Sequence, residues 1–196
     1  VINLTTKAIP RETFLTVGGD LSVNSETTNQ LGYTYYGSSQ DWSGFDNGNR
    51  DLKPALESYL ASGARISAGN VDTQAIAGEL ITGRNAVVQR DKNLPPNGSA
   101  TITGGTNFEI GDDATMGVIF NAGYSNKWRT RDTIQQTAST LDLSQKELDF
   151  RKVITDNRMV VNGLLGFGIE VGEQKIRWTN LFIRDTLKQA RLGVGT

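Results

Sequence analysis

The sequence predicts an all-β fold, built as an open antiparallel up-and-down sheet of about five long strands. Three observations predict it. Apolar and polar residues alternate with period two in several long runs, as they do in strands with one apolar face. Tight polar turns join these runs on one side of the sheet, whereas long segments join them on the other. The second face is rich in Gly, Thr, Asn and charged residues, where a soluble core would carry branched aliphatic ones.

The composition excludes several classes of chemistry. The 196 residues contain no cysteine and no histidine, which removes disulfides, thiolate zinc sites, cysteine nucleophiles and any triad that needs imidazole. The 20 basic and 21 acidic residues nearly cancel, so nothing marks a nucleic-acid-binding protein. No apolar run reaches the roughly 18 residues of a transmembrane helix. We find no catalytic constellation, no cofactor motif and no metal site, and we expect a protein that is not an enzyme.

The first strand is expected to run from about Glu12 to the tyrosine-rich residues 33–36, and a long loop follows over residues 38–97. Two stretches of this loop have helical spacing. The first begins at residues 51–54 (DLKP), where proline favours a first helical turn, and a glycine closes it. The second runs from about residue 72 to residue 80. The loop is therefore expected to carry short helices.

Four further strands are expected, at residues 99–111, 114–129, 150–172 and 175–190. Tight turns at residues 112–113 and 173–174 join the first pair and the last pair. A second long loop is expected over residues 130–148. The facing of the strand at 175–190 is left open, because aromatic and polar side chains share one parity there.

A soluble β-sandwich or barrel would also alternate apolar and polar residues. Strand length favours a sheet that crosses a membrane instead. The runs reach about 11 to 16 residues, whereas soluble strands average about five or six and a membrane-crossing strand needs about 9–11. Aromatic positions agree, since Phe108 and Trp178 lie near tight turns while Tyr124 and Trp128 lie far from them. Two such aromatic belts mark the interfaces of outer-membrane barrels.

Three stretches resemble TonB-dependent outer-membrane receptors. Residues 1–7 (VINLTTK) are similar to the segment that closes the plug domain in that family, although the glycine pair that precedes it there is missing from this sequence. Residues 44–50 (GFDNGNR) and residues 178–186 (WTNLFIRDT) resemble stretches in one group of large receptors of the family. The resemblance touches the start of the chain, the first long loop and the end.

The resemblance implies that the chain is a piece of such a receptor. Residues 1–9 would be the end of the plug domain, and residues 10–196 the N-terminal part of the β-barrel domain. The segments 38–97 and 130–148 would be extracellular loops. The barrel of this family has twenty-two strands, so five strands would not close and would leave two unpaired edges. A chain that starts in mid-strand is expected on this interpretation.

The function that the resemblance implies is uptake. The protein would be part of an active transporter in the cell outer membrane that imports a scarce ligand, namely an iron chelate (siderophore), cobalamin or an oligosaccharide (glycan). Its partners would be the lipid bilayer of the outer membrane, the small-molecule ligand, and TonB. The energy would arrive from TonB through an N-terminal segment that this sequence lacks.

Aromatic residues gather where the first long loop leaves the predicted sheet. Rings beside an arginine can stack on sugars or aromatic ligands, or bind a carboxylate, although such residues also pack the base of a loop. The candidate ligand-binding residues are Tyr35, Tyr36, Trp42, Phe45 and Arg50. The same loop carries acidic residues whose spacing departs from a calcium-binding loop, so we expect solvation for them. These are Asp41, Asp46, Asp51 and Glu57.

A soluble all-β carbohydrate-binding or adhesion module is the alternative hypothesis. The two hypotheses differ in the surroundings of one set of apolar side chains, which would face lipid in the receptor and a dry protein core in the module. The set comprises Leu15, Val17, Ile102, Phe120, Val161 and Phe167.

Overall fold

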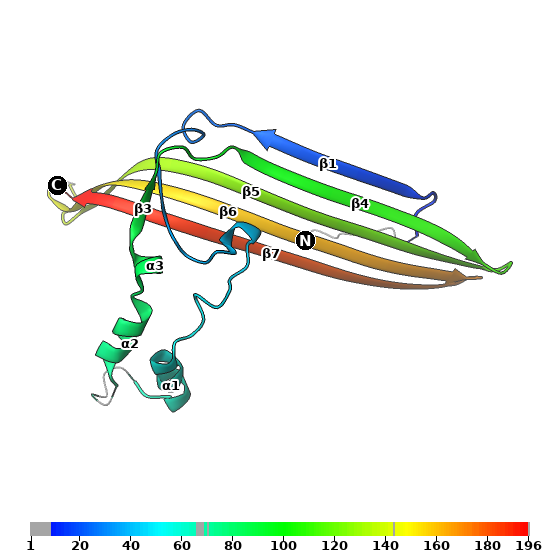
Figure 1. Cartoon of the computed structure of the whole chain (residues 1–196), viewed down its shortest axis with the longest axis horizontal. Helices are drawn as coiled ribbons and strands as arrows, with labels where there is room; N and C mark the ends of the chain where they lie inside the picture. Colours follow the sequence, from blue (N-terminus) through cyan, green and yellow to red (C-terminus); the bar gives the residue numbers. More distant parts are fainter. Residues whose placement is uncertain (1–8, 66–68, 70, 143, 196) are drawn as a thin grey trace. The chain divides into compact units, whose positions relative to one another are not determined.

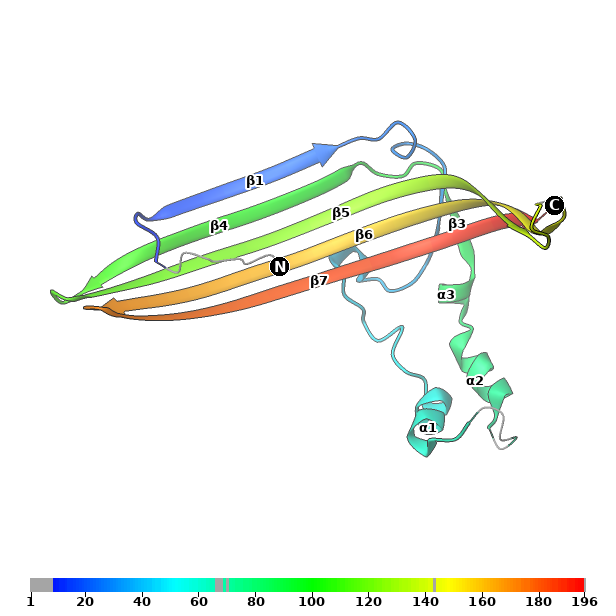
Figure 2. The same ribbon diagram turned by 180° about the vertical axis from the view of Figure 1, so that it is seen from behind.

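The structure is a computed structural model that describes residues 9–65, 69, 71–142 and 144–195. Its main feature is an antiparallel sheet of five strands in the order β1-β4-β5-β6-β7 (Figures 1 and 2). The strands are β1 Phe14–Ser22, β4 Asn97–Ile110, β5 Ala114–Ala138, β6 Lys146–Val171 and β7 Gln174–Gly195. This confirms the predicted all-β class and the predicted sheet of five long strands. Of the predicted plug segment 1–9, all but residue 9 lies outside the described residues.

The first long connection has structure of its own, as predicted for its helices. Two short strands, β2 Gly32–Tyr35 and β3 Val88–Asp91, pair antiparallel in a separate sheet. Between them lie the 3₁₀ helix η1 (Asp41–Ser43) and the helices α1 (Pro54–Ser62), α2 (Thr73–Leu80) and α3 (Gly83–Ala86). None of the helices among the described residues is long and apolar enough to cross a lipid bilayer.

Local chemistry explains where the two longer helices begin and end. Pro54 occupies the first turn of α1, where its missing N–H costs nothing, and Gly63 ends the helix with a left-handed φ of 63°. The carboxylate of Asp72 accepts a hydrogen bond of 2.9 Å from the Ala75 N–H and so caps α2. The bounds of α1 and α2 match those of the two helices predicted from residue spacing. The short helix α3 and the pairing of β2 with β3 were not predicted.

The first strand is shorter than predicted. β1 ends at Ser22, and the tyrosine-rich residues belong to the separate sheet of β2 and β3. The cause is a turn built on Asn24. Its carbonyl accepts hydrogen bonds from the N–H groups of Thr27 and Thr28, and its side-chain oxygen accepts one from Glu26. An Asn side chain that bonds to the backbone two residues ahead mimics a backbone turn and interrupts a strand.

The second long loop is also shorter than predicted. β5 continues to Ala138 and β6 begins at Lys146, so the strands take up most of residues 130–148. The pairing rests on polar contacts between the two strands, for example Arg151 with Asp132 at 2.5 Å and Gln136 with Asp149 at 2.9 Å. These positions carry no apolar alternation, so a search for period-two patterns missed them. β7 likewise continues past the predicted end at residue 190, to Gly195.

The chain divides into two compact units. The described residues of unit 1 lie within the ranges 1–28, 95–128 and 157–187, and those of unit 2 lie within the ranges 29–94, 129–156 and 188–196. Strands β5, β6 and β7 contribute residues to both. Unit 1 therefore holds β1, β4 and one part of each longer strand, whereas unit 2 holds the first long connection with the other part.

In unit 1 the strand register places the predicted apolar set on one face. Val17 pairs with Ile102, and Ile102 pairs with Ala122, so the three side chains share a face. On this face Leu15 is 66% exposed and Val17 73%, whereas Met159, which alternation places beside Val161, is fully buried. Ile102, Phe120 and Phe167 are less exposed, at 38%, 37% and 40%, and Val161 is half-buried. The buried hydrophobic residues among those the structure describes are Leu94, Met159 and Ala190.

The open question about β7 is answered by an aromatic contact in unit 1. The rings of Phe167 in β6 and Trp178 in β7 lie 5.5 Å apart between centroids. Trp178 therefore shares the face of Phe167, and alternation puts Ile176 and Phe182 there as well.

Candidate functional site

A group of charged and aromatic side chains in unit 2 surrounds Arg50. Its guanidinium donates two hydrogen bonds to Asp41, from Nη1 to Oδ1 at 2.7 Å and from Nη2 to Oδ2 at 2.9 Å. Nη1 also donates to Asp46 Oδ1 at 2.6 Å, and Nη2 to the Tyr35 hydroxyl at 3.4 Å. The planar guanidinium suits this two-pronged contact with a carboxylate. Arg50 thus connects the two ends of the segment 35–50, because it lies at one end and bonds to Tyr35 at the other.

Lys188 of strand β7 joins this group from the other end of the sequence. Its ammonium lies 2.9 Å from Asp41 Oδ2, donates to the Tyr36 carbonyl at 3.2 Å, and lies 4.7 Å from the centre of the Tyr35 ring. The side chains of Lys188 and Asp41 are each only 13% exposed. An ammonium that has lost most of its water needs such partners, because an unpaired buried charge is costly. We call Tyr35, Asp41, Asp46, Arg50 and Lys188 the charge cluster.

A sharp bend brings Asp41 and Arg50 together. Gly37 has a φ of +60°, and a Cβ atom there would lie 2.3 Å from Asp41 Oδ2 and 2.6 Å from Arg50 Nη2. Glycine is thus required both by the backbone angle and by the space. Next to it the nearly buried Ser38 hydroxyl accepts from the N–H groups of Gln40 and Asn47 and donates to the Asn47 side chain. These bonds close the segment from residue 37 to residue 50 into an ordered loop.

Electrostatics within the cluster shift three pKa values. Burial alone would raise the pKa of Asp41, but the hydrogen bonds and charges of Arg50 and Lys188 outweigh it and hold that pKa below 3.8. The backbone N–H of Arg50 is the main cause that lowers the pKa of Asp46. The bond to Asp41 raises the pKa of Arg50, which stays charged. Two carboxylates therefore face two cations, and the formal charges of the cluster balance.

The structure brings only part of the predicted ligand-binding set into one contact group. Tyr35 and Arg50 meet in the charge cluster, with the guanidinium 5.6 Å from the ring centre. Tyr36 contributes its carbonyl, while its side chain is 63% exposed and that of Trp42 is 68% exposed. Phe45 is partly exposed. Sequence reasoning missed Lys188, because it lies in the strand where alternation was least clean.

The acidic residues of the loop behave in two ways. Asp51 and Glu57 are exposed, in line with the expected solvation. Asp41 and Asp46 are not simply solvated, because Arg50 neutralises both and Lys188 also pairs with Asp41. No group of three or more acidic residues with the geometry of a metal site occurs in the part of the chain that the structure describes.

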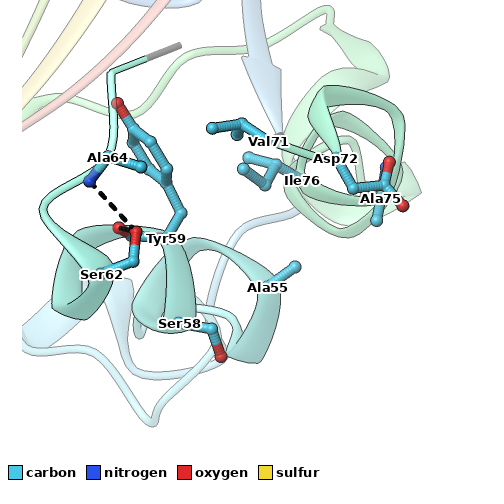
Figure 3. A pocket seen from close by; sticks show the side chains of 9 residues that line it. All are labelled: Ala55, Ser58, Tyr59, Ser62, Ala64, Val71, Asp72, Ala75 and Ile76. Carbon is cyan, nitrogen blue, oxygen red and sulfur yellow. Dashed lines mark hydrogen bonds between the residues drawn. The ribbon is translucent and has the colours of Figure 1, made fainter. Parts of the chain in front are cut away.

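A second feature of unit 2 is a hollow of about 420 Å³ between α1 and α2 (Figure 3). The face that α1 turns to it has helical spacing and mostly small side chains, and Tyr59 faces Val71 and Ile76 across the gap (Figure 3). Glu79 accepts a hydrogen bond of 2.8 Å from the Ala55 N–H and ties the two helices together. The lining residues are Ala55, Ser58, Tyr59, Ser62, Ala64, Val71, Asp72, Ala75 and Ile76.

The loop is attached to the long strands of unit 2 at one face of the sheet. The Tyr33 N–H donates to the Thr155 hydroxyl in β6 at 3.0 Å, and Lys188 in β7 holds Tyr36 and Asp41. Asp156 and Gln189 contact each other, so their neighbours Thr155 and Lys188 share the opposite face. The two attachment points therefore lie on the same side of the sheet.

Comparisons of the chain with protein-family models, with curated proteins and with solved structures found no match.

Proposed function

We propose that this chain is part of an active transporter of the cell outer membrane. On this proposal its five strands are one section of a twenty-two-stranded β-barrel of the TonB-dependent type. The transporter imports a scarce ligand (an iron chelate, cobalamin or an oligosaccharide) with energy delivered by TonB. The sequence resemblance suggests the family, and one structural observation supports the membrane location: among the described residues of the apolar face in unit 1, Leu15, Val17 and Trp178 are each more than half exposed.

The support comes first from surface chemistry. A soluble module of this length would bury most of its large apolar side chains, whereas Leu15, Val17 and Leu21 are each more than half exposed. Exposed apolar patches beyond a few hundred Å² are rare on soluble monomers. Contact with lipid avoids the free-energy cost of exposing such an apolar face to water.

The lengths of the strands and of their connections add support. β1 has nine residues and β4 has fourteen, which is enough to span the hydrocarbon layer at the tilt usual in barrels, since about 9–11 residues suffice. The turns after β4 and β6 are tight and carry glycines with left-handed φ, Gly111 at 65° and Gly172 at 55°. The connection between β1 and β4 is long and structured. Short turns opposite long loops are typical of outer-membrane barrels.

Ligand contact is proposed for the exposed aromatic side chains of the ordered loop. Tyr36, Trp42 and Phe45 present ring surface to solvent, and a ring-bearing ligand can stack on them. Tyr35 and Arg50 lie in the charge cluster, where their groups are already engaged. In this proposal they support the loop that carries the three exposed rings.

Site-directed spin labelling tests the membrane location. The chain has no cysteine, so single cysteines can be introduced directly. Ile102→Cys reports the apolar face, and Thr101→Cys, one residue earlier in β4, reports the opposite face as its matched control. In native outer membranes that contain the full gene product, we expect the label at residue 102 to be relaxed by oxygen, which dissolves in lipid. The label at residue 101 should be relaxed by a water-soluble nickel chelate.

The same measurement can contradict the proposal. A label at residue 102 that neither reagent reaches would lie in a dry protein core, as in a soluble β-module. Transport is tested separately, with cells that contain or lack the gene and a panel of labelled ferric chelates, cobalamin and maltooligosaccharides. Uptake of one compound that needs the gene and stops when a protonophore is added supports active import. Uptake that persists without the proton gradient argues for a passive pore.

A further inference from the structure

We infer that Lys188 of β7 is a positioning residue, which fixes the first loop on the sheet and presents Tyr36 and Trp42 as a rigid aromatic surface. The part of this inference that concerns ligand binding rests on the proposed function, whereas the fixing of the loop does not.

The Lys188 ammonium touches the two places in the loop that lie beside the exposed rings. It donates to the carbonyl of Tyr36, and it pairs with the carboxylate of Asp41, the residue before Trp42. Both contacts hold positions adjacent to the rings, and Tyr36 and Trp42 stay more than half exposed. One side chain thus sets the backbone position from which both rings project.

The charge cluster is a support and not a docking place for a charged ligand. Both oxygens of Asp41 are bound by Arg50, and Lys188 shares one of them. The formal charges of the two aspartates and the two cations cancel. A ligand that used one of these groups would have to break a nearly buried ion pair, which is costly. Recognition therefore falls to the exposed rings, and favours a ligand with a ring face and no need of a salt bridge.

We expect the loop to keep its own order when Lys188 is replaced. Arg50 still binds Asp41 and Asp46, and Ser38 still joins Gln40 to Asn47. What is lost is the hold of Lys188 in β7 on Tyr36 and Asp41. A substitution of Lys188 should thus let the loop move as a body on the sheet while its internal structure is retained. This outcome separates a positioning role from a role in folding.

Distances between two spin labels test the fixing of the loop. Gln40→Cys, at an exposed position beside Asp41, and Leu192→Cys in β7 are introduced together into the full gene product in membranes. We expect a narrow distance distribution in the parent and a broad one in Lys188→Met. Lys146→Met removes the same charge and an exposed ion pair from β6, so it serves as the matched control and should leave the distribution narrow.

Two further variants distinguish the loss of the Lys188 contact from a general folding defect. Lys188→Arg keeps the cation and its stacking on Tyr35, so it should restore most of the narrow distribution. Asp41→Asn weakens the same contact from the side of the loop and should broaden the distribution. A narrow distribution in both Lys188→Met and Asp41→Asn would overturn the inference, whatever the protein transports.

Uptake measurements test the role in presenting the rings. With the compound that the panel identifies, Lys188→Met should raise the concentration that gives half-maximal uptake roughly tenfold. The reason is that binding must then also order the loop, which costs free energy. Maximal uptake and the amount of protein in the membrane should stay near the parent values. Unchanged half-saturation together with a broad distance distribution would overturn the positioning role. If the parent takes up no compound at all, the proposed function fails, and the distance measurement still decides whether Lys188 fixes the loop.

Discussion

At the scale of single residues, the charge cluster shows how this chain keeps a loop in place with very little apolar core. Asp41 contacts both cations of the cluster, because it binds Arg50 with both oxygens and Lys188 with one of them. Charge-assisted bonds of this kind are shorter and stronger than neutral ones. Gly37 makes the arrangement possible, since any side chain there would enter the space of the Asp41–Arg50 pair.

The lowered pKa of Asp41 predicts how the loop responds to acid. A carboxyl group whose pKa is lower in the folded state stabilises that state above its unfolded pKa, and the effect is lost as the pH falls through the folded pKa. We therefore expect the mobility of a spin label at Gln40→Cys to stay constant from about pH 8 to about pH 5, and to rise only below the ordinary value of 3.8. Continuous-wave spectra over a pH series measure this.

Asp41→Asn is the control for the acid response. It cannot titrate, so its label should be mobile already at neutral pH, and only the smaller effect of Asp46 should remain in acid. A rise of mobility in the parent between about pH 7 and about pH 5 would point to a different group and contradict the assignment to Asp41.

At the scale of elements, the pairing of β1 with β4 and of β4 with β5 depends on where glycines let the strands and their neighbours come close. A Cβ atom at Gly105 would lie 2.8 Å from the Phe14 ring, 3.1 Å from the Val118 carbonyl oxygen and 3.2 Å from Pro10. At Gly98, in the same strand, the nearest atom would be 3.9 Å away. Small residues in a strand thus have different roles at different positions.

This contrast predicts unequal costs for two identical substitutions. Gly105→Ala should lower the free energy of unfolding by about 1–3 kcal/mol, since the new methyl group meets neighbours on three sides, one of them backbone. Gly98→Ala should change it by less than about 1 kcal/mol, because the methyl group makes only ordinary van der Waals contacts with Asp20 and Leu21. The midpoint of urea unfolding in detergent micelles, followed by tryptophan fluorescence, compares the two. Equal midpoints would contradict the close packing at Gly105.

At the scale of the whole molecule, apolar surface dominates the behaviour expected in water. The described residues bury only three hydrophobic side chains, while long strands expose many. Burial of such surface is the main driving force of folding and association. A medium that covers the exposed face, whether lipid or detergent, is needed to hold the chain in a dispersed state.

We therefore expect the purified chain to self-associate in detergent-free buffer and to disperse in micelles. Sedimentation velocity over a range of concentrations measures this directly. The variant Val17→Thr, which makes one exposed position of β1 more polar with little change in volume, should reduce the association slightly in proportion to the apolar area removed. A chain that remains monomeric in water at all concentrations would favour the soluble β-module over the membrane proposal.

The sequence by itself determined the features that depend on local patterns. Period-two alternation located the five strands, polar glycine turns joined them, and Pro54 and Asp72 marked the starts of the two longer helices. It also located the loop segment that carries Tyr35, Trp42 and Arg50. Each of these signals lies within a few residues of the feature it predicts, which is why reading along the chain was sufficient.

Only the tertiary structure decided which distant residues meet. The ends of β5 and β6 rest on cross-strand polar pairs such as Asp132 with Arg151, which leave no periodic signal in either strand. Lys188 reaches Asp41 because strand order and loop closure bring β7 beside the first loop within unit 2. Contacts of this kind depend on register and on the path of the chain through space. Alternation within a single strand carries no information about either.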